Sequence, residues 1–166
     1  MKRVLQFSGV ISALLGIVAL ILMMATPALR ISGDFILFKT QYDLPGTAAI
    51  FGGTDYEWKL AVLGLLGWIL ALVGVVVVLC GVILPLLKVK GIEKFAGLMN
   101  LVAVACLVVA GVFMFLVIPS FAGANFDGHT DGLSIGAGWV IGGILAIAAG
   151  AFAILPMAAD FLGKKK

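Results

Sequence analysis

Four long runs without a charged residue constrain the fold of this sequence more than any other feature. They cover about residues 4–24, 60–87, 95–118 and 133–155, and none contains Lys, Arg, Asp, Glu or His. A helix needs about 20 apolar residues to cross a bilayer core of roughly 30 Å. The chain of 166 residues is 63% hydrophobic and 11% charged, whereas a soluble domain carries about 25% charged residues. We therefore predict an all-α membrane protein, an antiparallel up-down four-helix bundle that forms one integral membrane domain over 1–166.

The first run also has features of a secretory signal peptide. Lys2 and Arg3 precede it, and the sequence Ala-Thr-Pro-Ala follows at 25–28, as a cleavage site would require. Its apolar stretch is longer than that of a usual leader. We therefore expect a retained transmembrane helix.

The basic residues are distributed unevenly between the two ends of the predicted helices. Eight lie at one end and three at the other, while the acidic residues number two and six. Lys and Arg concentrate on the cytoplasmic side of membrane proteins, so we expect a multi-pass plasma membrane protein with both termini in the cytoplasm. Basic residues at helix ends form no groove for nucleic acid, and we expect no such partner. The eight are Lys2, Arg3, Lys88, Lys90, Lys94, Lys164, Lys165 and Lys166.

Small residues recur along the apolar runs at helical spacing. In lipid, helices associate by close packing, and small side chains let their backbones approach. We interpret these stripes first as seams inside one bundle, and alternatively as faces for self-association. Four more small residues lie beside the stripe of the fourth run, and this surplus predicts room for an oligomer; they are Gly143, Ala148, Ala149 and Ala153. The stripes are Gly138, Gly142, Ala146 and Gly150 in the fourth run, and Gly64, Gly67, Ala71 and Gly74 in the second.

Two loops, about 26–59 and 120–132, are expected outside the cell. The stretch FILFKTQY at 35–42 favours a strand, and a second strand at 47–51 would pair with it across Leu44, Pro45 and Gly46. The second loop would add an edge strand to this small antiparallel sheet. Trp58 and Trp139 fall at the outer ends of two runs, where an aromatic belt is typical. The apolar loop residues would cap the bundle or form a docking surface; they are Ile36, Leu37, Phe38, Ile50 and Phe51.

Polar chemistry inside the runs is sparse. Asn100 is the main candidate, and an intramembrane polar group is a functional candidate by default; a contact between helices is the simpler interpretation. Ser8 and Ser12 are expected to bond back to their own helix. Cys80 and Cys106 lack a CxxC spacing and suit a core. We expect no cofactor and no resident metal.

One polar constellation lies in the second loop, at Asp127, His129 and Asp131. It resembles the start of a calcium loop, but position twelve is Gly138 where such a loop needs Glu. A turn with local side-chain bonds is the better interpretation. An enzyme at this position would need a nucleophile with a base, or a complete metal set, and neither is present in the sequence.

The layout of four helices, a strand-forming first loop and a shorter second loop resembles the claudin-like tetraspan membrane proteins. The likeness implies a sheet on a helical bundle. The claudin signature of a Trp, then Gly-Leu-Trp, then two Cys is absent, and Trp58 with Gly52 and Gly53 does not reproduce it. No functional residue is therefore carried over. The chain is also similar to small uncharacterised bacterial tetraspan proteins, which implies no activity.

Function follows less directly from these patterns. We expect a non-enzymatic membrane protein that self-associates or serves as a structural or accessory subunit for a larger membrane protein partner. The alternative is a channel or pore-forming subunit, which would need polar residues along its pore. No run carries a polar stripe.

Overall fold

The computed structural model describes residues 2–35, 38–53, 57–86 and 96–163. The lysine-rich turn at 88–94, the terminal lysines 164–166, Ile36 and Leu37 lie outside the described residues. In chain order, the elements are α1 (Lys2–Ala25), β1 (Pro27–Phe35), β2 (Phe38–Pro45), α2 (Gly46–Phe51), α3 (Val62–Leu86), α4 (Ala96–Phe115), α5 (Val117–Asn125), β3 (Leu133–Ile135) and α6 (Ala137–Gly163).

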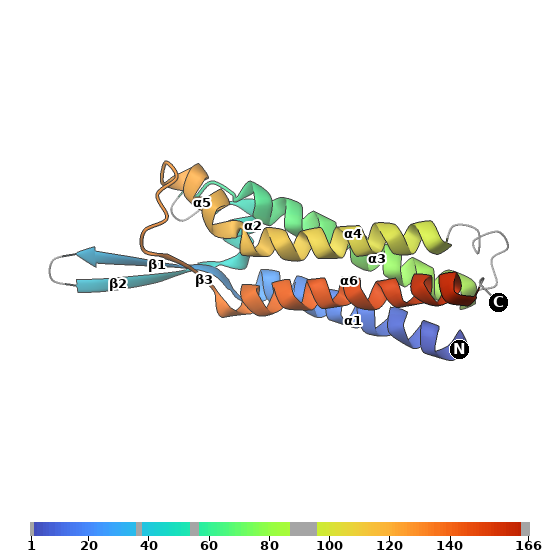
Figure 1. Cartoon of the computed structure of the whole chain (residues 1–166). Coiled ribbons are helices and arrows are strands. Elements are labelled where there is room, and N and C mark those ends of the chain that lie inside the picture. The colour runs from blue at the N-terminus through green and yellow to red at the C-terminus, as the bar shows by residue number, and fades with distance from the viewer. Residues whose placement is uncertain (1, 36–37, 54–56, 87–95, 164–166) are drawn as a thin grey trace.

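Four helices are long and apolar enough to cross a membrane. Their candidate spans are Phe7–Ala25, Val62–Leu84, Gly97–Phe115 and Ala137–Leu155. They lie side by side, with the start of α1 and the end of α6 at the same end of the bundle (Figure 1). The prediction of a mostly helical chain with four candidate membrane helices and a small antiparallel sheet is confirmed.

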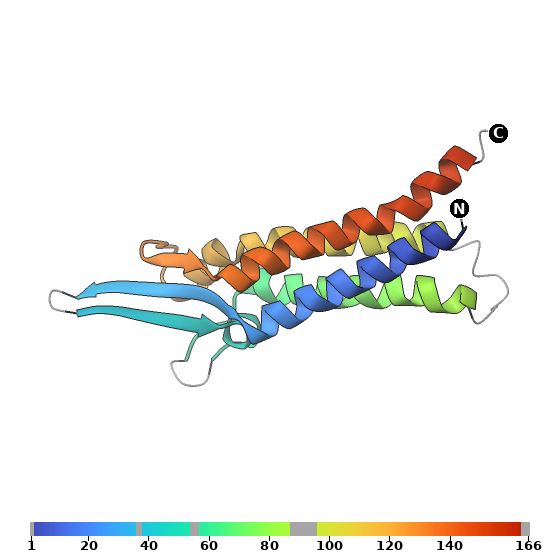
Figure 2. The same cartoon turned by 90° about the horizontal axis from the view of Figure 1, so that it is seen from below.

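The sheet has the strand order β2-β1-β3 and lies at the opposite end of the bundle, which we call the sheet end. β1 pairs antiparallel with β2 along its length, whereas β3 pairs only with Leu29, Arg30 and Ile31 of β1. Two views at right angles show the β1–β2 hairpin pointing away from the helices (Figures 1 and 2). The hairpin therefore continues as a two-stranded ribbon beyond the part that β3 covers.

Three boundaries at the sheet end differ from the predictions. The segment expected as a second strand at 47–51 belongs to helix α2, so Leu44–Gly46 is not a hairpin turn. The strand that pairs with β2 is instead β1, which precedes it in the chain. Pro45 holds φ at −57° immediately before α2, and Ala48 and Ala49 are strong helix formers. Residues 133–135, expected as the start of the fourth helix, form strand β3. The third run ends at Phe115, and a separate helix α5 follows.

The buried core continues from the bundle into the sheet end. Met23 of α1, Leu29 of β1, Leu44 of β2 and Trp139 of α6 are fully buried in one cluster. A second cluster lies deeper among the helices, around Leu107. The base of the hairpin is therefore packed into the core, and the outer parts of β1 and β2 extend beyond it.

Candidate functional site

The small-residue stripe of α6 lies against α1 and α4 of the same chain. A Cβ added at Gly142 would lie 2.6 Å from Met114 Cε and 3.5 Å from the Ala19 carbonyl oxygen. At Gly150 it would lie 2.7 Å from Val108 Cγ2, and at Gly138 it would overlap the Thr26 side chain. Ala146 is fully buried. The stripe thus forms a seam within the chain.

The stripe of α3 is used in the same way. An added Cβ at Gly67 would lie 3.2 Å from Phe113 Cβ, and at Gly74 it would lie 2.7 Å from Leu107 Cγ. Ala71 is fully buried, and Gly64 lies near the Trp139 ring. Gly67 and Gly74 face α4, so this stripe also sets a distance between helices of one chain.

Of the four small residues expected as surplus on α6, Gly143, Ala149 and Ala153 are buried and Ala148 is half-buried. A Cβ at Gly143 would lie 2.9 Å from the Phe115 ring, and Ala149 and Ala153 belong to the deeper cluster. The outward arc of α6 instead carries Ile141 and Ile144, which are 52% and 56% exposed. Large aliphatic side chains of this kind suit lipid contact better than close approach of another backbone.

Polar side chains in the spans make few bonds between helices. The Ser12 hydroxyl donates to the Ala149 carbonyl oxygen of α6 at 2.7 Å, so the prediction that Ser12 bonds within its own helix was wrong. Asn100 is half-buried on α4, and its Oδ1 lies 3.6 Å from the Cβ position of Gly81 on α3. Within the described residues, no hydrogen bond joins the Asn100 amide to another helix, although its position is between two helices.

Trp139 closes the junction between the bundle and the sheet. It is fully buried, and its Nε1 donates to the Met23 carbonyl oxygen at 3.0 Å. That carbonyl lies in the last turn of α1, where no helical N–H remains to bond it. The expectation that Trp139 belongs to an aromatic belt was therefore wrong, because the side chain is enclosed by protein.

A clamp around Asn125 joins the two connecting segments. Its Oδ1 accepts from the Lys59 N–H at 2.8 Å, and its Nδ2 donates to the Lys59 carbonyl at 2.9 Å. Beside it, the rings of Trp58, Phe121 and Phe126 lie with centroids 5.6 to 6.0 Å apart. Sequence reasoning missed this function of Asn125, because its partner is 66 residues distant and is a backbone group.

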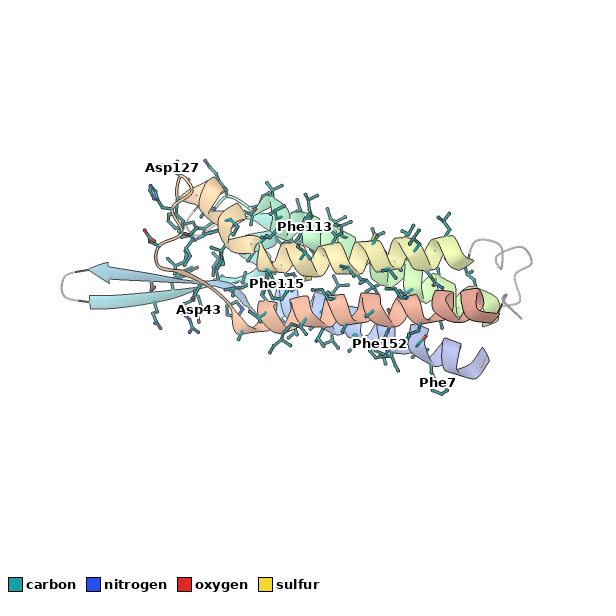
Figure 3. The ribbon with its side chains drawn as sticks, in the orientation of Figure 1. Phe7, Asp43, Phe113, Phe115, Asp127 and Phe152 are labelled. Atoms are coloured by element: carbon teal, nitrogen blue, oxygen red, sulfur yellow. The ribbon has the colours of Figure 1, made fainter. Side chains whose placement is uncertain are left out.

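The segment from Asp127 to Asp131 forms local turns at the sheet end (Figure 3). Asp127 has a positive φ of 51°, and the His129 N–H bonds the Phe126 carbonyl oxygen at 2.9 Å. In the part of the chain that the structure describes, no group of three or more His, Cys, Asp and Glu side chains could hold a metal ion. Local turn bonding therefore accounts for what the structure describes here.

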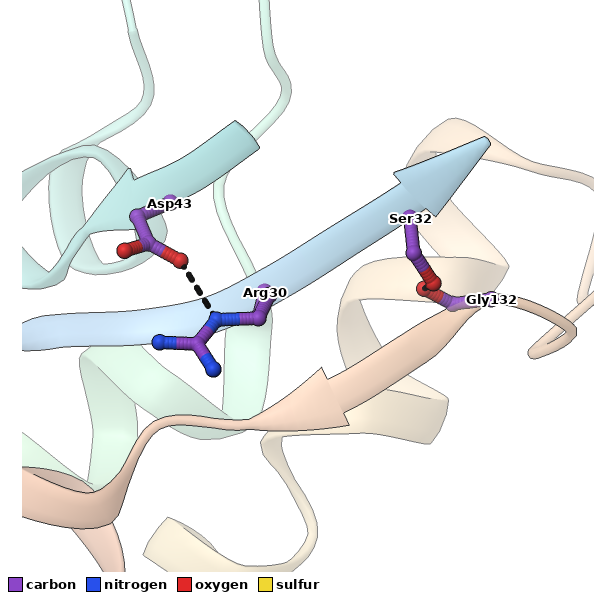
Figure 4. A network of polar contacts seen from close by, with 4 residues as sticks. All are labelled: Arg30, Ser32, Asp43 and Gly132. Atoms are coloured by element: carbon purple, nitrogen blue, oxygen red, sulfur yellow. Dashed lines mark hydrogen bonds and ion pairs between the residues drawn. The ribbon is translucent and has the colours of Figure 1, made fainter. Parts of the chain in front are cut away.

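An ion pair joins the two strands of the β1–β2 hairpin. Arg30 Nε donates to Asp43 Oδ1 at 2.8 Å across the two strands (Figure 4). Both side chains are about half exposed, at 55% and 47%. The hydrogen bond to Asp43 raises the pKa of the Arg30 guanidinium. Farther along the two strands, the register pairs the acidic residue Asp34 with the basic residue Lys39.

Strand β3 covers only the inner part of this hairpin. Ser32 is the last residue of β1 that reaches the segment before β3, where its N–H bonds the Gly132 carbonyl oxygen at 2.8 Å. Its hydroxyl bonds the same oxygen at 3.0 Å. Beyond Ser32, and along the whole outer edge of β2, no further strand is paired in the described residues.

Together these observations place the polar, accessible part of the described chain at the sheet end and leave the spans apolar and internally packed. Comparison with known proteins adds no assignment: no family model matches the chain, and no curated protein matches it.

Proposed function

We propose that this chain is a non-enzymatic integral membrane protein that assembles with other copies or with a membrane protein partner. In this proposal the sheet end lies outside the plasma membrane and both termini lie in the cytoplasm. The distribution of Lys and Arg in the sequence supports that orientation. The fold layout of a sheet on four helices also supports the likeness to claudin-like tetraspan proteins.

The observation that carries the proposal is the hairpin. It extends past the helices as a ribbon whose outer edge is unpaired in the described residues. An exposed strand edge offers a row of free N–H and C=O groups, and it is a template for pairing with another chain.

The spans support an assembly function in a different way. Their small stripes are occupied by neighbouring helices of the same chain, and their outward residues are large and aliphatic. We therefore assign the recognition of another protein to the sheet end. The same packing argues against a polar pore inside one bundle.

The test is the composition of the particle extracted with its native lipid. We would extract the tagged protein in polymer nanodiscs and measure particle mass and protein content by mass spectrometry. The proposal predicts several copies of the chain, or one or two copies with a different membrane protein. A single copy alone, at expression levels that match the untagged protein, would overturn it.

A further inference from the structure

The backbone groups on the outer edge of β2 can be assigned from the bonds of β1. The Ser32 N–H bonds Gly132, and the Ala28 carbonyl accepts from Gly136. Even-numbered residues of β1 therefore turn toward β3, and odd-numbered residues turn toward β2, since bonding direction alternates along an antiparallel strand. In the observed register, Ile31 pairs with Tyr42 and Gly33 with Thr40. The outward groups of β2 are consequently those of residues 39, 41 and 43.

The sequence of this edge is complementary to itself. Lys39 and Asp43 stand two residues before and two residues after Gln41. An antiparallel pairing of β2 with β2 of a second copy, centred on Gln41, puts residue 39 of each copy opposite residue 43 of the other. Opposite charges directly across a strand pair stabilise a sheet, and like charges destabilise it.

Other symmetric pairings lack this match. Moving the twofold axis by two residues puts Lys39 opposite Lys39, or Asp43 opposite Asp43. A parallel pairing about a twofold axis sets N–H against N–H, because equivalent residues then face each other at the same height. Only the pairing centred on Gln41 joins three outward residues of each copy and alternates their charges correctly.

From this match we infer that the outer edge of β2 is a dimer interface whose partner is a second copy of this chain. The inference rests on the proposed assembly function and names its partner. The hairpin points away from the helices. Antiparallel pairing therefore puts the two helical bundles at opposite ends of one continuous sheet, along the direction of its strands. The complex is a head-to-head dimer. Exposed Gln41 and Asp43 become covered in it, and the ribbon gains the additional strands that an isolated two-stranded hairpin lacks.

The test uses two charge-swapped chains that each keep the charge pairing within their own hairpin. The first carries Asp34→Lys with Lys39→Asp, and the second carries Arg30→Asp with Asp43→Lys. Each retains the net charge of the parent chain and the opposite-sign pairs of its own register. A dimer of the first chain sets two acids against two acids, and a dimer of the second sets two bases against two bases. A mixture restores opposite charges throughout.

Each purified chain is placed in nanodiscs at one copy per disc, and pairing of discs is measured by mass and by electron microscopy. Wild-type discs are expected to pair face to face. Each swapped chain alone should pair about tenfold more weakly or worse, given two reversed cross-strand contacts, and the mixture should recover wild-type pairing. Unchanged pairing of either swapped chain, no recovery in the mixture, or unpaired wild-type discs would overturn the inference.

A backbone variant checks the same edge without changing charge. Gln41→Pro removes an outward N–H and leaves the N–H groups that bond β1 in place, as proline on an edge strand permits. We expect pairing to be lost while thermal unfolding of the single disc is retained. If native extraction shows several copies or a partner while these discs never pair, the proposed function stands and this interface is wrong.

Discussion

Inside the four spans, small residues let the helix backbones approach closely, whereas in the β1–β2 hairpin polar residues lie along an exposed strand edge. Gly142 and Gly150 are enclosed by neighbouring helices of the same chain, while Gln41 and Asp43 are exposed. Both patterns are regular in the sequence. The difference teaches that a small-residue stripe in a membrane helix is not in itself an interface between copies, since the chain can occupy it with its own helices.

The largest effect is expected in the small-residue stripe of α6, which neighbouring helices of the same chain contact. Gly142→Leu puts a branched side chain where even a Cβ lies 2.6 Å from Met114 Cε. Overpacking a core costs about 1–3 kcal/mol or more, so we expect a lower unfolding temperature in detergent. Ile144→Leu, on the exposed arc of the same helix, is the matched control and should leave the temperature unchanged. Loss of association with full stability would show instead that the stripe acts between copies.

The next effect concerns the junction between the spans and the sheet. Trp139→Phe removes the donor to the Met23 carbonyl and leaves a void in a fully buried position. A lost hydrogen bond costs about 1 kcal/mol and an unfilled cavity adds to it. We expect a clear fall in unfolding temperature. Trp68→Phe is the control, because the Trp68 Nε1 is buried without a hydrogen-bond partner; an equal fall in both variants would remove the hydrogen bond as the cause.

A smaller, local effect is expected at the Asn125 clamp. Asn125→Ala deletes the bonds to both backbone groups of Lys59, and the exchange of the Lys59 amide proton should accelerate by about tenfold for each 1.4 kcal/mol of protection lost. Global stability should change little, because the site is exposed. His129→Ala is the control with no expected change. Unaltered exchange at Lys59 would mean that the clamp does not hold the two segments together.

The smallest effect is expected at the Arg30–Asp43 pair. Arg30→Gln removes an ion pair that is about half exposed on both sides, and such surface pairs contribute little to stability. The unfolding midpoint of the variant should not shift measurably from that of the parent chain. A large shift would mean that the hairpin is held by its charges and not by its buried base.

Prediction from sequence was accurate where one physical requirement dominated. The runs at 4–24 and 60–87 correspond closely to α1 and α3, because twenty uncharged apolar residues have few alternatives to a spanning helix. It failed at 47–51 and 133–135. Both segments are short and apolar, and periodicity does not separate a strand from a helix at that length.

The candidate site was less predictable than the fold. The stripes on α3 and α6 were visible as patterns, but their neighbours were not. Asn125 and Trp139 were visible as residues, yet each bonds a backbone group more than sixty residues away. Only a folded chain brings such groups together.

By itself the sequence determined the four apolar helices and the bias of basic residues between their ends. Both follow from the cost of placing charge or an unbonded backbone in lipid, which acts on each segment alone. The tertiary structure decided which helix occupies each glycine seam, that the first loop forms a projecting hairpin, and that β2 is an edge strand. These features depend on contacts between segments far apart in the chain, and no local sequence pattern encodes which segments come into contact.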